Sequence, residues 1–466
     1  MDMENPKRRS HLHKVNLHQV NQLPPELTEA SQNPLTNSIT NSIADNIYKS
    51  FPAFKSRNFR LYIIGQVFSL SGTFMTQMAI PWLIYDLTKS PWLLGLSGFL
   101  GFLPSLILIP FSGVLSDRWD RKDLLKLVQI LGISVSATLT LVTTLELAEF
   151  WSLLILSILG GVLKGLDMPV RHAFVVEMVE DRQDLSNAIA INSTMLACSR
   201  LMGPAIGGIL LATVGVKFCF LYDTISYVAA IWALAVMTLP ASKPMQISQR
   251  ISTWKRLQEG FNYVADFLPV KAIILLLALQ GIFGFAHVVL LPIYAAEILQ
   301  GGEKILGWLS ASPAFGAILS SIYLSQRRQV AGLERLIALC PLSIGLCAIA
   351  YAFSNVLWIS LPLLVIMGGI STLHISCSNT VIQTIVDDSK RGRVMSFYSL
   401  SLIGMLPICN LFTGTLAHWL GAPNTLLVTG SICILASAWF WRQLPLISKS
   451  ILNAMHSINR AEKATA

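Results

Sequence analysis

Charged residues are scarce in this chain of 466 residues: Asp, Glu, Lys and Arg together make up 13% of it, whereas 53% is hydrophobic. A soluble globular domain carries about a quarter charged residues. The mean hydropathy is correspondingly high, at +0.60. This composition excludes an ordinary soluble domain and predicts an integral membrane protein.

Several motifs are also missing. The seven Cys residues form no C-x-x-C pair and no Cys/His spacing typical of a metal site, which excludes a disulfide framework and a zinc site. No Walker A sequence occurs, so we do not expect ATP hydrolysis to drive this protein. We recognise no nucleophile–base pair and no cofactor loop, and therefore expect neither an enzyme nor a bound cofactor. The basic N-terminal residues precede no short apolar run, which argues against a cleaved signal peptide.

Twelve apolar segments follow a polar N-terminal stretch, and most of them run to 18 or more residues. A helix needs about 20 residues to cross a hydrocarbon core of about 30 Å. The segments lack the alternation of barrel strands, and only helices and closed barrels satisfy their own backbone groups in lipid. We therefore predict an all-α membrane protein with 12 transmembrane helices. The segments are Leu61–Tyr85, Leu93–Leu115, Leu124–Leu145, Trp151–His172, Ala188–Val214, Phe218–Leu239, Ala272–Ala296, Ile305–Leu324, Leu336–Phe353, Leu357–Ser378, Val394–Leu416 and Thr425–Trp441.

Positive charge is distributed unevenly among the connections. The net charge is +9, and all but five of the 34 Lys and Arg residues lie before the first segment, after the last one or in even-numbered connections, when Lys126 and Arg171, at the segment ends that border such connections, are counted with them. Lys89, Lys217 and Lys304 lie in odd-numbered connections, and Lys164 and Arg200 lie within segments. The positive-inside rule then places both termini in the cytoplasm. The charge reflects membrane topology, so we expect no nucleic-acid partner.

The longest connection divides the segments into six plus six. Within it Trp254, Leu257, Phe261, Val264 and Phe267 recur at helical spacing, which predicts an amphipathic helix on the inner leaflet. An offset of 206 residues aligns glycines of the two halves, as expected of two parallel repeats. The predicted regions are a disordered cytoplasmic tail at 1–50, a six-helix bundle at 51–239, a linker at 240–271, a second bundle at 272–442 and a cytoplasmic tail at 443–466.

The connection between the second and third segments concentrates charge in ten residues, Gly113-Val114-Leu115-Ser116-Asp117-Arg118-Trp119-Asp120-Arg121-Lys122. Its Lys and Arg residues alone would satisfy the positive-inside rule, which leaves Gly113 and Asp117 unexplained. The pattern G-x-L-x-D-R-x-x-R-K between two membrane helices resembles the signature loop of the major facilitator superfamily of secondary transporters. The family has a glycine where this chain has Asp120. An ordinary loop that only sets topology is the alternative.

The resemblance implies two pseudo-symmetric six-helix bundles and a conformational latch on the cytoplasmic side. Gly113 would allow a close helix approach, and Asp117 would meet the N-terminus of the helix that begins near Arg393. Arg121 and Lys122 would pair with carboxylates at the end of the fourth segment. The carboxylates available there are Asp167, Glu177 and Glu180, and the predicted latch residues are Gly113, Asp117, Arg118, Arg121, Lys122 and Arg393.

Three further stretches resemble a bacterial exporter branch of this superfamily that includes enterobactin-type siderophore exporters and macrolide efflux pumps. They are Gly165-Leu166-Asp167-Met168-Pro169-Val170-Arg171, Leu87-Thr88-Lys89-Ser90-Pro91 and Arg391-Gly392-Arg393-Val394-Met395-Ser396. The resemblance implies a monomeric exporter of a small organic molecule, siderophore-like or macrolide-like, in the bacterial plasma membrane. Uptake or facilitated diffusion of a metabolite is the alternative within transport. A non-transporting sensor or scaffold is the alternative of another class.

The fifth segment carries Gly203-Pro204-Ala205-Ile206-Gly207-Gly208, which resembles the end of a motif associated with antiporters and implies exchange against protons. A proline kinks a helix and glycines thin it, so a kinked packing helix is the alternative.

Ionisable residues inside the membrane are costly and are candidates for function by default. The candidates for coupling or substrate binding are Lys164, Asp167, Arg200, Asp223 and His287. A proton carrier is sought among Asp167, Asp223 and His287. For Asp167 the alternative is a structural ion pair with Arg121 or Lys164, and His374 is interpreted as a helix-packing histidine.

Overall fold

The structure is a computed structural model that describes residues 51–178, 184–238, 253–327 and 332–465. Contacts divide the chain into two units, Met1–Phe54 and Lys55–Ala466. The predicted tail at 1–50 lies outside the described residues. In the rest of the first unit, the rings of Phe51 and Phe54 meet edge to face at 6.2 Å between centroids. A 3₁₀ turn, η3, covers Pro52–Lys55, and the remaining described helices belong to the second unit.

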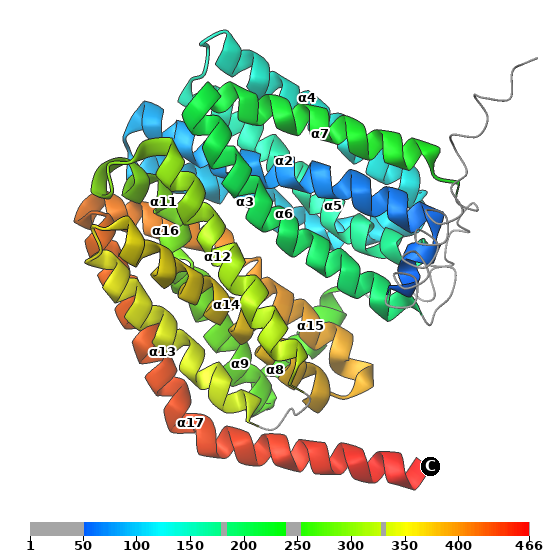
Figure 1. The fold of residues 1–466 in the computed structure, drawn as a ribbon. Coiled ribbons are helices and arrows are strands. Elements are labelled where there is room, and N and C mark those ends of the chain that lie inside the picture. Colours follow the sequence, from blue (N-terminus) through cyan, green and yellow to red (C-terminus); the bar gives the residue numbers. More distant parts are fainter. Residues whose placement is uncertain (1–50, 179–183, 239–252, 328–331, 466) are drawn as a thin grey trace, which may run out of the picture. The chain divides into compact units, whose positions relative to one another are not determined.

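The described residues contain 12 helical spans long and apolar enough to cross a membrane, which confirms the predicted number and the all-α fold class. Six of these spans precede residue 239 and form the first bundle (Figure 1). Their helices are α2 (Arg57–Thr88), α3 (Pro91–Arg118), α4 (Arg121–Thr144), α5 (Phe150–Glu177), α6 (Leu185–Val214) and α7 (Val216–Val236).

The second bundle differs from the first in having interrupted spans. Its seventh span, Leu268–Ile298, contains two π-helical segments, η5 and η6, and its eleventh, Lys390–Leu420, comprises most of α15 together with α16. The elements from the linker onward are α8 (Thr253–Asp266), α9 (Leu268–Leu279), η5 (Gln280–Gly284), α10 (Ala286–Val289), α11 (Leu291–Ile293), η6 (Tyr294–Ile298), α12 (Gly302–Ser325), α13 (Leu333–Ala352), α14 (Leu357–Ile385), α15 (Asp388–Leu402), α16 (Met405–Leu420) and α17 (Ala422–Thr465). π-Helical turns inside longer helices are frequent at functional positions.

Local sequence explains the start of α4. Asp120 is its N-cap, and its carboxylate accepts hydrogen bonds from the backbone N–H groups of Lys122 and Asp123 at 2.9 and 3.1 Å. The φ of Asp120 is −61°, so this position requires no glycine. Asp120, which departs from the family's loop pattern, therefore serves as a helix cap.

The last helix is longer than the sequence predicts. We expected the twelfth segment to end at Trp441, but α17 continues through Pro445 to Thr465, beyond the other helices of the second bundle (Figure 1). Ile447 and Ile451 are buried in the core of this bundle, which stabilises the continuation past Trp441. The hydropathy of the sequence falls after Trp441, but the helical backbone continues, so hydropathy alone misplaced the end of this helix.

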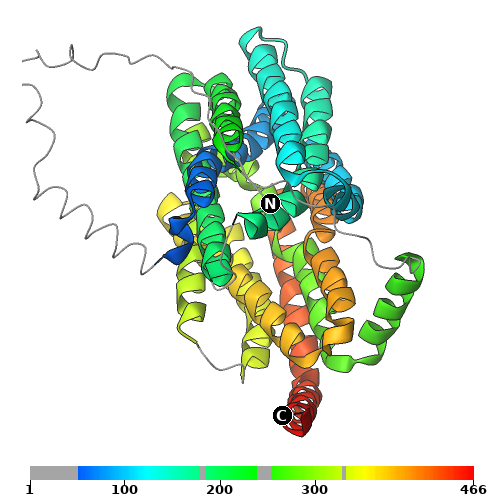
Figure 2. The same cartoon turned by 90° about the vertical axis from the view of Figure 1, so that its right-hand side faces the viewer.

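The linker helix α8 lies alongside α15 (Figure 2). Arg393 Nη1 lies 2.7 Å from Glu259 Oε2, and the rings of Phe261 and Phe397 are 6.3 Å apart. Val264 is buried in the core of the second bundle. The side chains of Trp254 and Leu257 lie outside the described part. The described apolar residues of α8 thus contact the second bundle.

The two bundles meet through glycines and through a shared apolar cluster. α6 packs on α12 and α3 packs on α16, and a Cβ at Gly307 would lie 2.5 Å from Gly208 Cα. At the end of the first span, the Tyr85 hydroxyl donates to Glu297 of the seventh span. We call this region the Tyr85 end, and the opposite region, where Arg121 pairs with Glu177, the Arg121 end.

Candidate functional site

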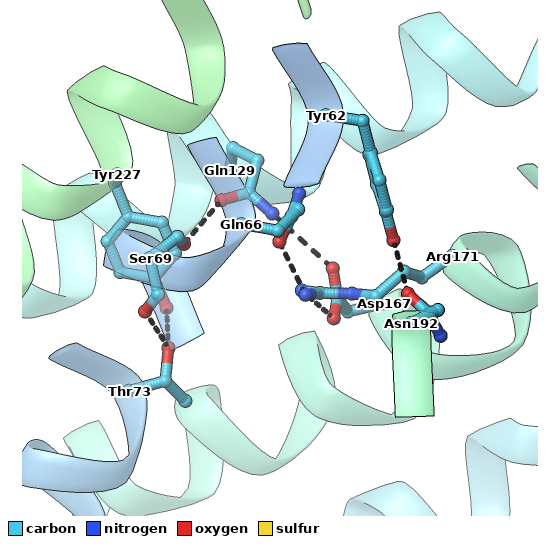
Figure 3. A network of polar contacts seen from close by, with 9 residues as sticks. All are labelled: Tyr62, Gln66, Ser69, Thr73, Gln129, Asp167, Arg171, Asn192 and Tyr227. Carbon is cyan, nitrogen blue, oxygen red and sulfur yellow. Dashed lines mark hydrogen bonds and ion pairs between the residues drawn. The ribbon is translucent and has the colours of Figure 1, made fainter. Parts of the chain in front are cut away.

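A partly buried ion pair within α5 is the centre of a polar network in the first bundle (Figure 3). Arg171 Nη2 lies 2.5 Å from Asp167 Oδ2, one helical turn away. Arg171 Nη1 donates a second bond of 2.5 Å to Gln66 on α2. Both side chains of the pair are less than 20% exposed. A buried pair is tolerated when further hydrogen bonds satisfy its remaining atoms, and Gln66 provides one of them.

The network extends across α2 and α4 (Figure 3). Gln129 Nε2 on α4 lies 3.4 Å from Asp167 Oδ1, and the Ser69 hydroxyl on α2 donates to Gln129 Oε1 at 3.3 Å. Gln66, Ser69 and Gln129 are all buried. Gln66 accepts from Arg171, and Gln129, whose oxygen accepts from Ser69, donates to Asp167, so the charged groups are fixed by two neighbouring helices.

Two outlying contacts connect α6 and α7 with α2. Tyr62 donates to Asn192 on α6 at 3.4 Å, and the hydroxyls of Thr73 and Tyr227 lie 3.4 Å apart (Figure 3). The network and these contacts thus involve five helices of the first bundle, α2 and α4–α7. A rearrangement of any of these helices changes the surroundings of the Asp167–Arg171 pair.

Asp223 on α7 is a carboxyl group that is buried more deeply than Asp167 and has different surroundings. Its Oδ2 accepts hydrogen bonds from Thr76 at 2.8 Å and from Ser136 at 3.1 Å. Its Oδ1 is buried without a hydrogen-bond partner, and no described cation lies within ion-pair distance. Gly72 on α2 makes room for it, because a Cβ there would lie 2.7 Å from Oδ1. Asp223 is therefore held by neutral donors on one oxygen only.

Lys164 and Arg200 are basic side chains that contact aromatic rings. Lys164 Nζ lies 5.3 Å from the centre of the Phe102 ring, and the Arg200 guanidinium lies 5.5 Å from that of Phe74. In the described part of the chain, neither has a carboxylate within 4 Å. An aromatic face attracts a cation without neutralising it, so both charges can still attract an anion.

The second bundle places its two deep histidines in the seventh and tenth spans. His287 is buried, and its Nδ1 lies 3.0 Å from the carbonyl oxygen of Gly284, the last residue of η5. His374 on α14 is fully buried and contacts Gln280, the first residue of η5. Both histidines therefore flank the π-helical segment of the seventh span.

A family model described as a transmembrane secretion effector matches residues 48–464. The chain belongs to this family. It is a membrane transporter of the major facilitator superfamily, as the loop at residues 113–122 predicted.

Relatives of this chain include named transporters of siderophores and antibiotics. The chain is 24% identical to the staphyloferrin A transporter of Staphylococcus aureus, over 79% of this chain and 92% of the relative. It is 22% identical to macrolide efflux protein A of Streptococcus pyogenes, over 79% and 92%. The enterobactin exporter of Shigella boydii is 25% identical over 76% and 82%. These relatives confirm the resemblance to the exporter branch.

Solved structures show the same fold. A bacterial homologue of the human lysosomal transporter Spinster superposes with a TM-score of 0.64 at 15% identity, covering 85% of this chain and 98% of the other. A bacterial homologue of the iron transporter ferroportin gives a TM-score of 0.65 at 15% identity, covering 83% and 98%.

Of the predicted latch residues, those whose side chains the structure describes lie at the Arg121 end. Arg121 Nη1 lies 2.7 Å from Glu177 Oε1, whereas Lys122 Nζ donates to the carbonyl oxygen of Met237 at 2.5 Å rather than to a carboxylate. Arg393 pairs with Glu259 of α8. The surroundings of Gly113, the side chains of Asp117 and Arg118, and residue Glu180 lie outside the described part.

The glycines of the fifth span lie at two helix contacts. Side chains at Gly203 and Gly207 would collide with α2, and one at Gly208 would collide with Gly307 of the other bundle. Pro204 lies within α6, which continues to Val214. The motif thus contributes both to the first bundle and to the contact between bundles.

Sequence reasoning did not identify the actual partner of Asp167. We considered Arg121 and Lys164, but the ion pair forms with Arg171, which the charge count assigned to the cytoplasmic side. The spacing of four residues on one helix was a signal for this pair. Gln66, Gln129 and Asn192 were missed as well, because an amide in an apolar segment has no distinguishing sequence pattern.

Proposed function

We propose that this protein exports a small organic molecule by alternating access, driven by protons that move in the opposite direction. We further propose that it lies in the bacterial plasma membrane with both termini in the cytoplasm, so that the Arg121 end is cytoplasmic. The lysine and arginine distribution supports this orientation. The macrolide efflux and enterobactin exporter relatives support the direction of transport.

The proposal of a proton drive rests on the contrast between the carboxyl groups of Asp167 and Asp223. Asp167 is paired with Arg171, so a proton on Asp167 would leave a buried cation without its partner. Asp223 has no described ion-pair partner and retains a free oxygen, Oδ1. Lys164 acts on it electrostatically only from beyond 4 Å and lies over the Phe102 ring, so Asp223 can gain and lose a proton without breaking a direct ion pair, and we assign it the coupling role.

The charges that remain without a carboxylate favour an anionic cargo. Lys164 and Arg200 each lie over a phenylalanine ring and have no described acidic partner within 4 Å. An oxygen-rich anionic ligand would receive charge-assisted hydrogen bonds from both. Between the two classes suggested by the relatives, a siderophore-like anion fits these cations better than a macrolide-like compound.

The latch at the Arg121 end would hold the bundles together in the outward-facing state. Arg121 is already ordered by Glu177, and Arg393 by Glu259. We propose that Gly113, Asp117 and Arg118 complete the contact between the second and eleventh spans when this end closes. Release of this contact would open the cargo-binding site between the bundles to the cytoplasm.

The function is tested by efflux from intact cells that are loaded with either an anionic siderophore or a cationic macrolide. We expect cells that lack the protein to retain the siderophore, and we expect an uncoupler to produce the same retention in cells that have it. Efflux that continues with the uncoupler present would contradict the proton drive. Unchanged retention of both compounds in the deletion strain would contradict the cargo assignment.

Changing Asp223 to Asn is expected to abolish uncoupler-sensitive efflux while membrane insertion and ligand binding are retained, because the amide cannot carry the proton. Efflux and binding are measured on the same proteoliposomes. Asp86→Asn is the matched control, since Asp86 pairs with Lys89 at 2.6 Å and is about half exposed. Full proton-driven efflux by Asp223→Asn would remove Asp223 from the mechanism.

Changing Arg200 to Gln is expected to weaken binding of an anionic ligand about 10- to 100-fold, because a hydrogen bond to a charged group contributes about 1.5–3 kcal/mol. Isothermal titration in detergent measures the change. Lys217→Gln is the control, because Lys217 also lies over a ring, that of Phe218 at 5.7 Å, but at the Tyr85 end. Equal effects of the two substitutions would show a general charge effect and no site at Arg200.

A further inference from the structure

The seventh and tenth spans enclose a group of buried polar atoms that lack partners. His374 Nδ1 contacts Gln280 Oε1 across the two spans. The other polar atoms of these two side chains, His374 Nε2 and Gln280 Nε2, have no hydrogen-bond partner within the described part of the chain. The hydroxyls of Ser371 and Ser378 are likewise without partners. All four side chains are at most 5% exposed.

These four residues lie close together on their helices. Ser371 precedes His374 by three residues and Ser378 follows it by four, so both flank it on one face of α14. Gln280 opens the π-helical segment η5, and Gly284 leaves space beside it, because a Cβ there would lie 2.7 Å from Gln280 Cγ. The unpartnered serine hydroxyls therefore come from the helical turns of α14 on either side of His374, and the unpartnered amide comes from the residue where the seventh span departs from α-helical geometry.

Buried polar groups in folded proteins are almost always hydrogen-bonded, and a group of four without partners implies a ligand. Water is the ligand that this set of atoms favours. The Gln280 amide can only donate, the serine hydroxyls donate and accept, and His374 Nε2 accepts when Nδ1 donates to Gln280. A cation would face the amide hydrogens, and a larger molecule could not reach side chains so deeply buried.

We propose that Gln280, Ser371, His374 and Ser378 form a buried hydration site that joins η5 to the tenth span. A buried water typically makes about three hydrogen bonds to otherwise unsatisfied groups, and this site supplies donors and acceptors of both kinds. Water beside a π-helical turn exchanges partners as the helix rearranges, so the seventh span can bend there without leaving polar groups unsatisfied. The site is independent of the cargo and of the coupling carboxyl group.

Radiolytic labelling of the full-length protein in lipid nanodiscs tests the site. Hydroxyl radicals formed from bound water in ¹⁸O-water mark residues beside that water even when they are buried. Cys377, between His374 and Ser378 in the chain, and Cys219 are both fully buried, which makes Cys219 the matched control. We expect Cys377 and His374 to incorporate ¹⁸O several-fold faster than Cys219. Equal rates for Cys377 and Cys219 would overturn the proposal.

A variant without the polar atoms provides the second measurement. In Gln280→Leu/His374→Leu/Ser378→Ala, labelling of Cys377 is expected to fall to the rate of Cys219. An unchanged rate would show that the water lies elsewhere. If this variant does not insert, the comparison within the native protein still decides. The thermal unfolding midpoint of the native protein is also compared in sodium chloride and in choline chloride. A higher midpoint in sodium chloride would show that a cation, and not water, occupies the site, and would overturn the proposal.

Discussion

Replacing Arg171 by Met is expected to lower the free energy of unfolding by about 3–5 kcal/mol, the cost of leaving one member of a buried ion pair without its partner. Arg171 holds Asp167 on its own helix and Gln66 on α2, both at 2.5 Å. Its removal leaves a partly buried carboxylate without its cation, with only Gln129 as a hydrogen-bond donor, and leaves the buried Gln66 amide oxygen without its donor. Steric-trap unfolding in bicelles measures the loss.

The double variant Asp167→Leu/Arg171→Met is the control for this prediction. It removes both charges together, and replacing a whole buried pair by apolar residues of similar volume is often neutral or stabilising. We therefore expect the double variant to regain most of the stability lost in Arg171→Met. A single variant that loses less than about 1 kcal/mol would place the pair among weak, solvated ion pairs.

Changing Gly208 to Val is expected to separate the bundles at the contact between α6 and α12. A Cβ at either Gly208 or Gly307 collides with the backbone of the other. Overpacking of this kind costs about 1–3 kcal/mol, which shifts a two-state population about 5- to 150-fold. The conformation shown here, with the Tyr85 end in contact, should therefore lose population, and transport should fall with it. Spin labels at Lys89→Cys and Lys304→Cys report the change as a longer distance.

Gly160→Val is the matched control, because Gly160 is also in a membrane-spanning helix but a Cβ there would meet no atom within 4 Å. We expect its label distance and its transport to match those of the parent protein. An unchanged distance in Gly208→Val would show that the glycine contact does not decide which end of the bundles is closed.

Much of the fold follows from composition and from the length of the apolar segments. A chain with few charges and 12 long apolar segments has no alternative in lipid to a bundle of helices, and hydropathy locates most of the helices to within several residues. The ends of helices were harder to predict from the sequence, since α17 runs well beyond Trp441. The hydrophobic signal ends where the lipid ends, whereas a helix continues as long as its backbone bonds and its packing persist.

The sequence by itself determined that this is a 12-span transporter of the major facilitator superfamily, and it pointed to Asp167, Asp223 and the glycines of the fifth span. Only the tertiary structure decided how these residues are partnered: Asp167 with Arg171, Asp223 with two hydroxyls, and Gly208 with Gly307. Lipid selects for apolar composition along every span, a property that a single sequence displays directly. A buried polar contact depends on which helix faces meet, and that is set by the packing of the whole bundle.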